Sequence, residues 1–82
     1  QFKITVYRNH KHDQMVEFVY DYTDQLIDCY LHENRSQAYE IMRRKNFDPI
    51  YSSISKSELE HKINYCTNIW LNRSSIANND KS

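Results

Sequence analysis

Residues 14–32 read QMVEFVYDYTDQLIDCYLH, and this stretch decides the fold because it is compatible with both a helix and strands. With 100° between successive helical residues, the five acidic residues from Asp13 to Asp28 fall within one arc of about 80°. The large apolar residues gather on the opposite side of the same helix. This separation predicts one long amphipathic helix over 14–32, with Asp13 as its N-cap.

The alternative for the same stretch is a β-hairpin or a three-stranded meander. Val, Ile, Phe and Tyr are abundant in it, and these residues favour strands and have modest helix propensity. Near its end, Ile27, Cys29 and Leu31 alternate with more polar residues, which is the two-residue period of a strand. We favour the helix because strands would scatter the acidic residues over both faces of a sheet.

Two shorter segments are predicted to pair as strands. In residues 2–8, FKITVYR, the apolar residues Phe2, Ile4 and Val6 alternate with more polar ones, which is typical of a half-buried strand. A polar turn over 9–13 follows. Residues 50–54 form a short extended segment. We expect it to pair with the first strand, because a lone strand leaves its backbone groups unpaired.

Two further helices are indicated by the residues at their ends. Residues 34–46 begin at Asn34, which is a good N-cap, and end at Asn46, which suits a left-handed conformation. The next helix begins with Ser55 and Glu58 in the spacing of a capping box. Its apolar seam consists of Leu59, Ile63, Cys66 and Trp70.

Together these elements predict an α+β fold. It is a mostly helical small single domain of order β-α-α-β-α with a minimal two-stranded sheet. The domain covers residues 1–72. Residues 73–82 are rich in Asn, Ser, Asp and Lys and are expected to be a polar, flexible C-terminal tail. The alternative fold is an N-terminal β-meander followed by two helices.

The chain of 82 residues contains no glycine, whereas average usage of about 7% would give roughly six. Phosphate-binding loops need glycine so that backbone N–H groups can approach the anion. Walker-type loops, dinucleotide-binding loops, nucleophile elbows and EF-hands are therefore excluded. Residues with AT-rich codons, such as Asn, Ile, Tyr and Lys, are abundant. We therefore expect a phage or mobile element with an AT-rich genome as the source.

Residues 13–33 carry six acidic side chains and no Lys or Arg. Acids four residues apart on a helix repel each other, so a purely structural helix would usually have lysines among them. We therefore expect an acidic helix face that binds a basic partner. The simpler interpretation is a solvated face that is neutralised within the molecule. The partner-binding candidates on this face are Glu17, Asp21, Asp24 and Asp28.

Seven tyrosines are more than a small core can hold with every hydroxyl paired. A surface tyrosine is a favoured contact residue, because it is large and rigid with a polar tip. The AT-rich codons of tyrosine explain the number equally well. The aromatic partner-binding candidates are Tyr20, Tyr39 and Tyr65, which lie off the predicted helix seams.

Two basic clusters suggest nucleic-acid binding as the alternative function. Against it, the 11 basic and 11 acidic residues give a net charge of zero, whereas nucleic-acid modules are usually basic. Basic residues at the end of a helix are also explained by the helix dipole. The candidate nucleic-acid contacts are Lys3, Arg8, Lys11, Arg43, Arg44 and Lys45.

The sequence predicts no metal, cofactor or catalytic residue. Cys29-x2-His32 and His61-x4-Cys66 contain the residue types of a zinc site, but both cysteines are predicted to face the core and His61 points away. Two buried thiols explain the cysteines without a metal. They would pair as a disulfide only in an oxidising compartment. No Ser, His and Asp are placed together as catalysis requires.

Small size, the absence of ligand-binding loops and one-sided charge predict a non-enzymatic protein–protein interaction module. We expect an accessory or regulatory protein, of the inhibitor type, that occupies the surface of a partner protein in the cytoplasm of a bacterial host. A homodimer formed through the strand at 2–8 is an additional expectation. The chain has no apolar run long enough to span a membrane.

Overall fold

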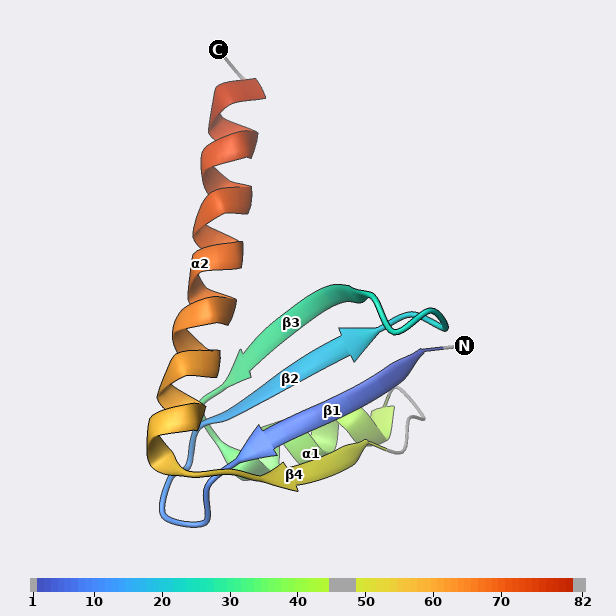
Figure 1. Cartoon of the computed structure of the whole chain (residues 1–82), viewed down its shortest axis with the longest axis vertical. Coiled ribbons are helices and arrows are strands. Elements are labelled where there is room, and N and C mark those ends of the chain that lie inside the picture. Colours follow the sequence, from blue (N-terminus) through green and yellow to red (C-terminus); the bar gives the residue numbers. More distant parts are fainter. Residues whose placement is uncertain (1, 45–48, 81–82) are drawn as a thin grey trace.

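The structure is a computed structural model that describes residues 2–44 and 49–80, with side chains described as far as Arg73. Within these residues, four strands and two helices follow one another along the chain. They are β1 (Lys3–Arg8), β2 (Met15–Tyr20), β3 (Leu26–His32), α1 (Arg35–Arg44), β4 (Ile50–Ser53) and α2 (Lys56–Asp80) (Figure 1).

The strands form one mixed sheet in the order β3-β2-β1-β4. β1, β2 and β3 make an antiparallel meander, and β4 returns to pair in parallel with β1, from Thr5↔Ile50 to Arg8↔Ser53. A parallel partner requires a crossover connection, and α1 lies within it. The expected pairing of residues 2–8 with residues 50–54 is therefore confirmed.

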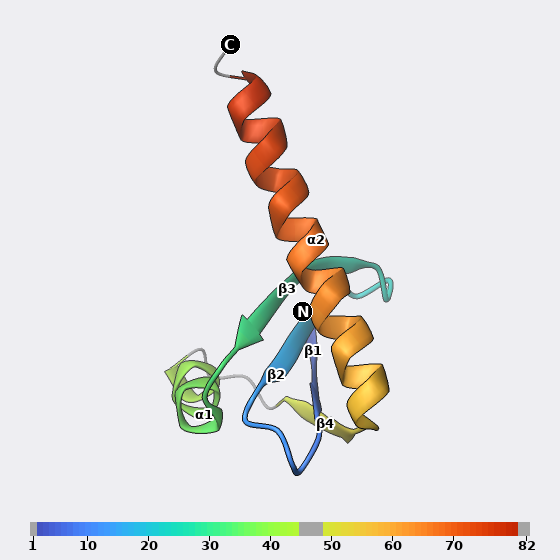
Figure 2. The ribbon, with the colours of Figure 1, turned by 90° about the vertical axis from the view of Figure 1, so that its left-hand side faces the viewer.

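The two helices cover opposite faces of the sheet, so that the sheet is the middle of three layers (Figure 2). The core on the α1 side consists of Ile4, Val6, Met15, Ala38 and Met42. The core on the α2 side consists of Val16, Phe18, Cys29, Leu59 and Cys66. Alternate residues of β2 point to opposite faces, so this strand contributes to both cores.

The predicted helix over 14–32 is wrong, because this stretch forms β2 and β3. The α+β class is correct, but the sheet has four strands instead of two and the domain is not mostly helical. β2 lies between two other strands and is covered on both faces. Such a strand has a nearly continuous apolar sequence without simple alternation, and Met15, Val16 and Phe18 are all buried.

Two of the acids that suggested a helix face belong to the β2–β3 turn. Asp21 Oδ1 accepts hydrogen bonds from the backbone N–H groups of Thr23 and Gln25, at 2.8 and 3.0 Å. Asp24 adopts a positive φ of 63°, a conformation that Asp and Asn tolerate better than most other non-glycine residues. Their spacing therefore reflects the chemistry of a turn, although it matches the period of a helix.

Both later helices are present with the predicted N-terminal caps. Asn34 Oδ1 accepts from the N–H of Ser36 at 2.9 Å, and Ser55 Oγ accepts from the N–H of Glu58 at 3.2 Å. The backbone of α2 continues to Asp80, so it extends into the expected tail, whose flexibility stays a prediction. The proposed left-handed residue Asn46 lies outside the described residues.

Candidate functional site

The four acidic candidates do not share a helix face, because the helix on which that face was predicted does not exist. Glu17 points into the interior from β2 and is fully buried. Its Oε1 lies 2.9 Å from Nε2 of His32 on β3, and His32 is also buried. Among the described residues, Glu17 Oε2 has no hydrogen-bond partner.

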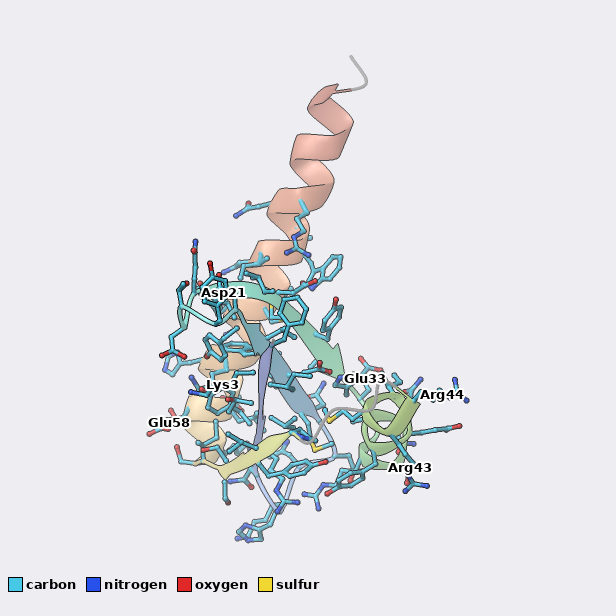
Figure 3. All side chains as sticks on the ribbon, turned by 90° about the vertical axis from the view of Figure 1, so that its right-hand side faces the viewer. Lys3, Asp21, Glu33, Arg43, Arg44 and Glu58 are labelled. Atoms are coloured by element: carbon cyan, nitrogen blue, oxygen red, sulfur yellow. The ribbon has the colours of Figure 1, made fainter. Side chains whose placement is uncertain are left out.

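The other three acids lie towards the β2–β3 turn. Asp21 holds the turn, and the hydrogen bonds from the Thr23 hydroxyl and from the Gln25 and Thr23 backbone lower the pKa of its carboxyl. Asp24 is exposed and lies 3.7 Å from the ammonium group of Lys3. Figure 3 shows Asp21 at the end of the sheet far from Arg43 and Arg44 on α1. The acidic residues of the turn and these basic residues therefore lie in different parts of the molecule.

Asp28 on β3 has three partners. Its Oδ1 accepts from its neighbour Cys29 N–H at 2.8 Å and from Arg73 at 3.0 Å, and its Oδ2 accepts from the Tyr30 hydroxyl at 2.6 Å. Burial acts to raise the pKa of Asp28, but the three hydrogen bonds outweigh burial and lower the pKa. The bond to the Asp28 carboxylate, followed by burial, raises the pKa of Tyr30 to about 12.

The three tyrosine candidates lie on different surfaces. Tyr20 is half-buried on β2, with its hydroxyl 3.5 Å from that of Tyr7, and burial and this bond raise its pKa. Tyr65 is 51% exposed on α2 and packs against Phe18. Tyr39 is exposed on α1. The structure therefore does not bring the three together into one contact surface.

The basic candidates divide between two ends of the molecule. Arg8 lies beside α1, donating to the Tyr39 hydroxyl at 3.2 Å, and its guanidinium is 5.1 Å from the centre of the Tyr51 ring. Lys3 is at the other end of β1, near Asp24. Arg44 pairs with Glu40 at 2.6 Å, and Arg43 and Lys11 are exposed. Lys45 lies outside the described residues.

Arg35, which the sequence did not single out, anchors α1 to the β1–β2 turn. Its guanidinium donates to the carbonyl oxygens of Asn9 and His12, with NH2 at 2.7 and 2.8 Å. Arg35, Tyr39 and Arg43 recur every four residues and therefore lie on one face of α1. This face and Arg8 form a basic corner with two tyrosine rings, Tyr39 and Tyr51, whose centres are 5.4 Å apart.

Cys29 and Cys66 are both free and buried between β3 and α2. Burial, and after it a hydrogen bond with Cys29, raises the pKa of the Cys66 thiol to about 12. This contact confirms the expectation that the two cysteines share one core.

β3 is an edge strand, so alternate residues direct their backbone groups away from the sheet. At Cys29 these groups are occupied, since the N–H donates to Asp28 and the carbonyl accepts from Trp70 Nε1 at 2.6 Å. Leu31, two residues later, has the same orientation. By the same alternation its N–H and carbonyl point to the open edge, and no hydrogen bond reaches them from outside the sheet among the described residues.

A groove of about 570 Å³ lies beside this open part of the edge, between α1 and α2. We call it the β3-edge groove. Trp70 and Leu71 in its wall are 42% and 61% exposed. It is lined by Tyr30, Leu31, His32, Gln37, Ile41, Cys66, Thr67, Trp70 and Leu71. The sequence placed Trp70 on the apolar seam of its helix but missed the groove, because α2 is far along the chain from β3 and α1, which form the other walls.

A second cavity, of about 280 Å³, lies on the α1 side of the sheet. We call it the sheet-face cavity. Two of the four predicted acids, Glu17 and Asp28, meet in its wall. It is lined by Phe2, Ile4, Glu17, Val19, Ile27, Asp28 and Tyr30.

In the described part of the chain, no three His, Cys, Asp or Glu side chains are grouped as a metal site would require. Neither described helix has the length and apolar character needed to cross a membrane. No family model, curated protein or solved structure matches the chain.

Proposed function

We propose that the chain is a non-enzymatic protein-interaction module that binds an extended segment of a partner protein in the β3-edge groove. One observation carries the proposal: unpaired backbone groups of Leu31 lie at a sheet edge beside an apolar groove. An added strand would pair with these groups, and its side chains would enter the groove, as in other strand-addition complexes.

The edge is suited to a short segment. At Cys29 the Asp28 carboxylate and the Trp70 indole already occupy the backbone groups, so strand pairing cannot extend towards the β2–β3 turn without displacing them. Trp70 is held in place by Arg73, whose guanidinium lies 4.6 Å from its ring centre. The proposed partner segment therefore pairs near Leu31 and places an apolar side chain against Trp70 and Leu71. An inhibitor or regulator that is encoded by a phage or mobile element would use such a contact to occupy the surface of its partner protein.

A displayed library of random peptides tests this proposal. We expect the enriched peptides to carry apolar residues at alternate positions and to protect the Leu31 amide from hydrogen exchange. Leu71→Lys should abolish binding, because it places a charge in the groove. Ile50→Lys is the matched control, since Ile50 is 56% exposed on the opposite edge strand β4. Equal binding by both variants, or an unprotected Leu31 amide, would contradict the proposal.

Sedimentation of the chain alone separates a partner segment from a second copy. We expect a monomer over the concentrations used for the peptide experiments. The homodimer predicted through residues 2–8 is not available, because β1 lies between β2 and β4 and is not an edge strand. A dimer that Leu71→Lys dissociates would assign the groove to a second copy of the chain and overturn the proposed partner.

A second candidate function, binding of single-stranded nucleic acid, is favoured by the basic corner of α1. Arg8 lies against Tyr39 and Tyr51, and Arg43 lies on the same face of α1 as Tyr39. Arginines beside aromatic rings can hold phosphates and stack bases. Binding of a labelled oligothymidine should weaken as salt increases, and Arg43→Glu should weaken it further. Lys56→Glu, an exposed position at the start of α2, is the control. Equal effects of the two substitutions would remove this candidate.

A further inference from the structure

We propose that the sheet-face cavity binds an organic cation, namely a primary ammonium group carried on a short apolar stem. This site is separate from the β3-edge groove and does not depend on the proposed protein-binding function.

The cavity lies on the part of the sheet that α1 leaves uncovered. In the described part of the chain α1 has ten residues, and its buried residues Ala38 and Met42 pack in the core with Val6 and Met15. The strands continue beyond it towards the β2–β3 turn (Figure 2). The cavity of about 280 Å³ forms there, and its apolar wall is contributed by Phe2, Ile4, Val19 and Ile27.

The buried carboxylate of Glu17 supplies the polar end of the site. Its Oε1 is bonded to His32 at 2.9 Å, whereas Oε2 is buried and has no partner among the described residues. A carboxylate oxygen can accept more than one hydrogen bond, and leaving it without a donor in the interior is unfavourable. An ammonium group entering the cavity would donate the missing hydrogen bond.

The charges around the cavity select a cation. Glu17 and Asp28 are both in its wall, and no Lys or Arg is among the residues that line it. Arg73 reaches Asp28 from α2, and Asp28 Oδ2 accepts from Tyr30. Glu17 Oε2 is therefore the acceptor that a ligand would engage, because the Asp28 carboxylate is already paired with Arg73. An anion would be repelled by the Glu17 carboxylate.

The size and lining indicate a small ligand. At about 280 Å³ the cavity lies just below the usual range for small-molecule sites. The four apolar side chains suit a stem of a few methylene groups. A free alkylamine and the side chain of a lysine in another protein share this chemistry.

Nuclear magnetic resonance titration with n-butylammonium, compared with 1-butanol, tests the site on the wild-type chain. We expect saturable shifts at Ile4, Ile27 and Tyr30 with the amine, and binding by the alcohol that is about tenfold weaker or more, since it lacks the charge-assisted hydrogen bond. Equal affinity for the two probes, or shifts that do not saturate, would overturn the proposal.

Two substitutions that each remove one negative charge sharpen the test. Glu17→Gln keeps the shape of the side chain and should weaken n-butylammonium binding about tenfold or more. Asp24→Asn is the matched control, because Asp24 is exposed outside the cavity and Asn tolerates its positive φ. This variant should bind n-butylammonium with an affinity within about twofold of the wild type, as expected for the loss of a distant exposed charge. Equal losses in both variants would show attraction by overall charge alone and overturn the site. If Glu17→Gln does not fold, the amine and alcohol comparison on the wild type still decides.

A peptide with one central lysine between alanines, titrated in parallel, separates the two sources of the cation. Binding of both n-butylammonium and the peptide supports a site open to a lysine of another protein. Binding of n-butylammonium alone supports a site for free amines, and binding of neither overturns the proposal.

Discussion

Trp70 of α2 donates a hydrogen bond from its indole Nε1 to the backbone carbonyl of Cys29 on β3, at 2.6 Å. This bond connects two residues that are 41 positions apart in the sequence, and it occupies one of the outward-facing groups of an edge strand. An unoccupied sheet edge invites pairing with other chains. Trp70 therefore both fixes α2 to the sheet and limits the open edge to the region of Leu31.

Trp70→Phe should lower the free energy of unfolding by about 1–2 kcal/mol, because a hydrogen bond is lost with some packing against Tyr30. Urea unfolding followed by circular dichroism measures the change. Leu71→Ala, one residue later and exposed, should change it by less than about 0.5 kcal/mol. Equal effects would mean that the indole bond contributes nothing to stability.

His32→Leu should destabilise the domain by about 3–5 kcal/mol, because it leaves the buried Glu17 carboxylate without its partner. Replacing both residues, with Glu17→Met and His32→Leu together, should restore most of this loss, since no buried charge then remains. With Glu17→Met alone as the third variant, these unfolding free energies and that of the wild type form a double-mutant cycle. A double variant as unstable as His32→Leu alone would show that packing, and not the carboxylate, causes the loss.

Asp24→Gly should raise the free energy of unfolding, by up to about 1 kcal/mol, because glycine adopts a positive φ without the steric cost that other residues have. Asp24→Ala should lower it by a similar amount for the opposite reason. Thermal unfolding of the two variants, in which the same charge is removed, isolates the backbone effect. The expected order is refuted if the Asp24→Ala variant is as stable as the Asp24→Gly variant.

The lowered pKa of Asp28 predicts a loss of stability in acid. Because its folded-state pKa lies below the unfolded value of about 3.9, its contribution is present above pH 4 and disappears as the pH falls through the folded-state pKa. Asp28→Asn should therefore be less stable than the wild type at pH 7, and the difference should shrink when the pH is lowered to 2. Unfolding measured at both values, with a carboxyl titration by nuclear magnetic resonance, checks the sign.

Cys66 should be unreactive in the folded chain. With a pKa of about 12, its thiolate fraction at pH 8 is on the order of 1 in 10,000, and the thiolate is the reactive form. Labelling with a maleimide followed by peptide mass spectrometry should find Cys66 unmodified in buffer and modified in guanidinium. Rapid labelling of Cys66 in buffer would mean that the contact between β3 and α2 opens readily.

Local signals in the sequence were sufficient for the elements that do not depend on distant partners. The alternation of residues 2–8, the cap at Asn34 and the cap at Ser55 each involve neighbouring residues, and each is present in the structure. The seam of α2 was found in the same way, because a helix shows its period within a few turns.

The tertiary structure decided residues 14–32, because a strand is stabilised by partners elsewhere in the chain. Lys3 pairs with Tyr20 and Met15 with His32, and these pairings outweigh a local period that matches a helix. The candidate site depended on the same pairings. They bury Glu17 and bring it to one cavity with Asp28, while Asp21 and Asp24 remain in the turn. The sequence by itself determined that the chain has these acids and no glycine. Only the sheet, by burying some side chains and leaving others at its edge, determined which of them line a site.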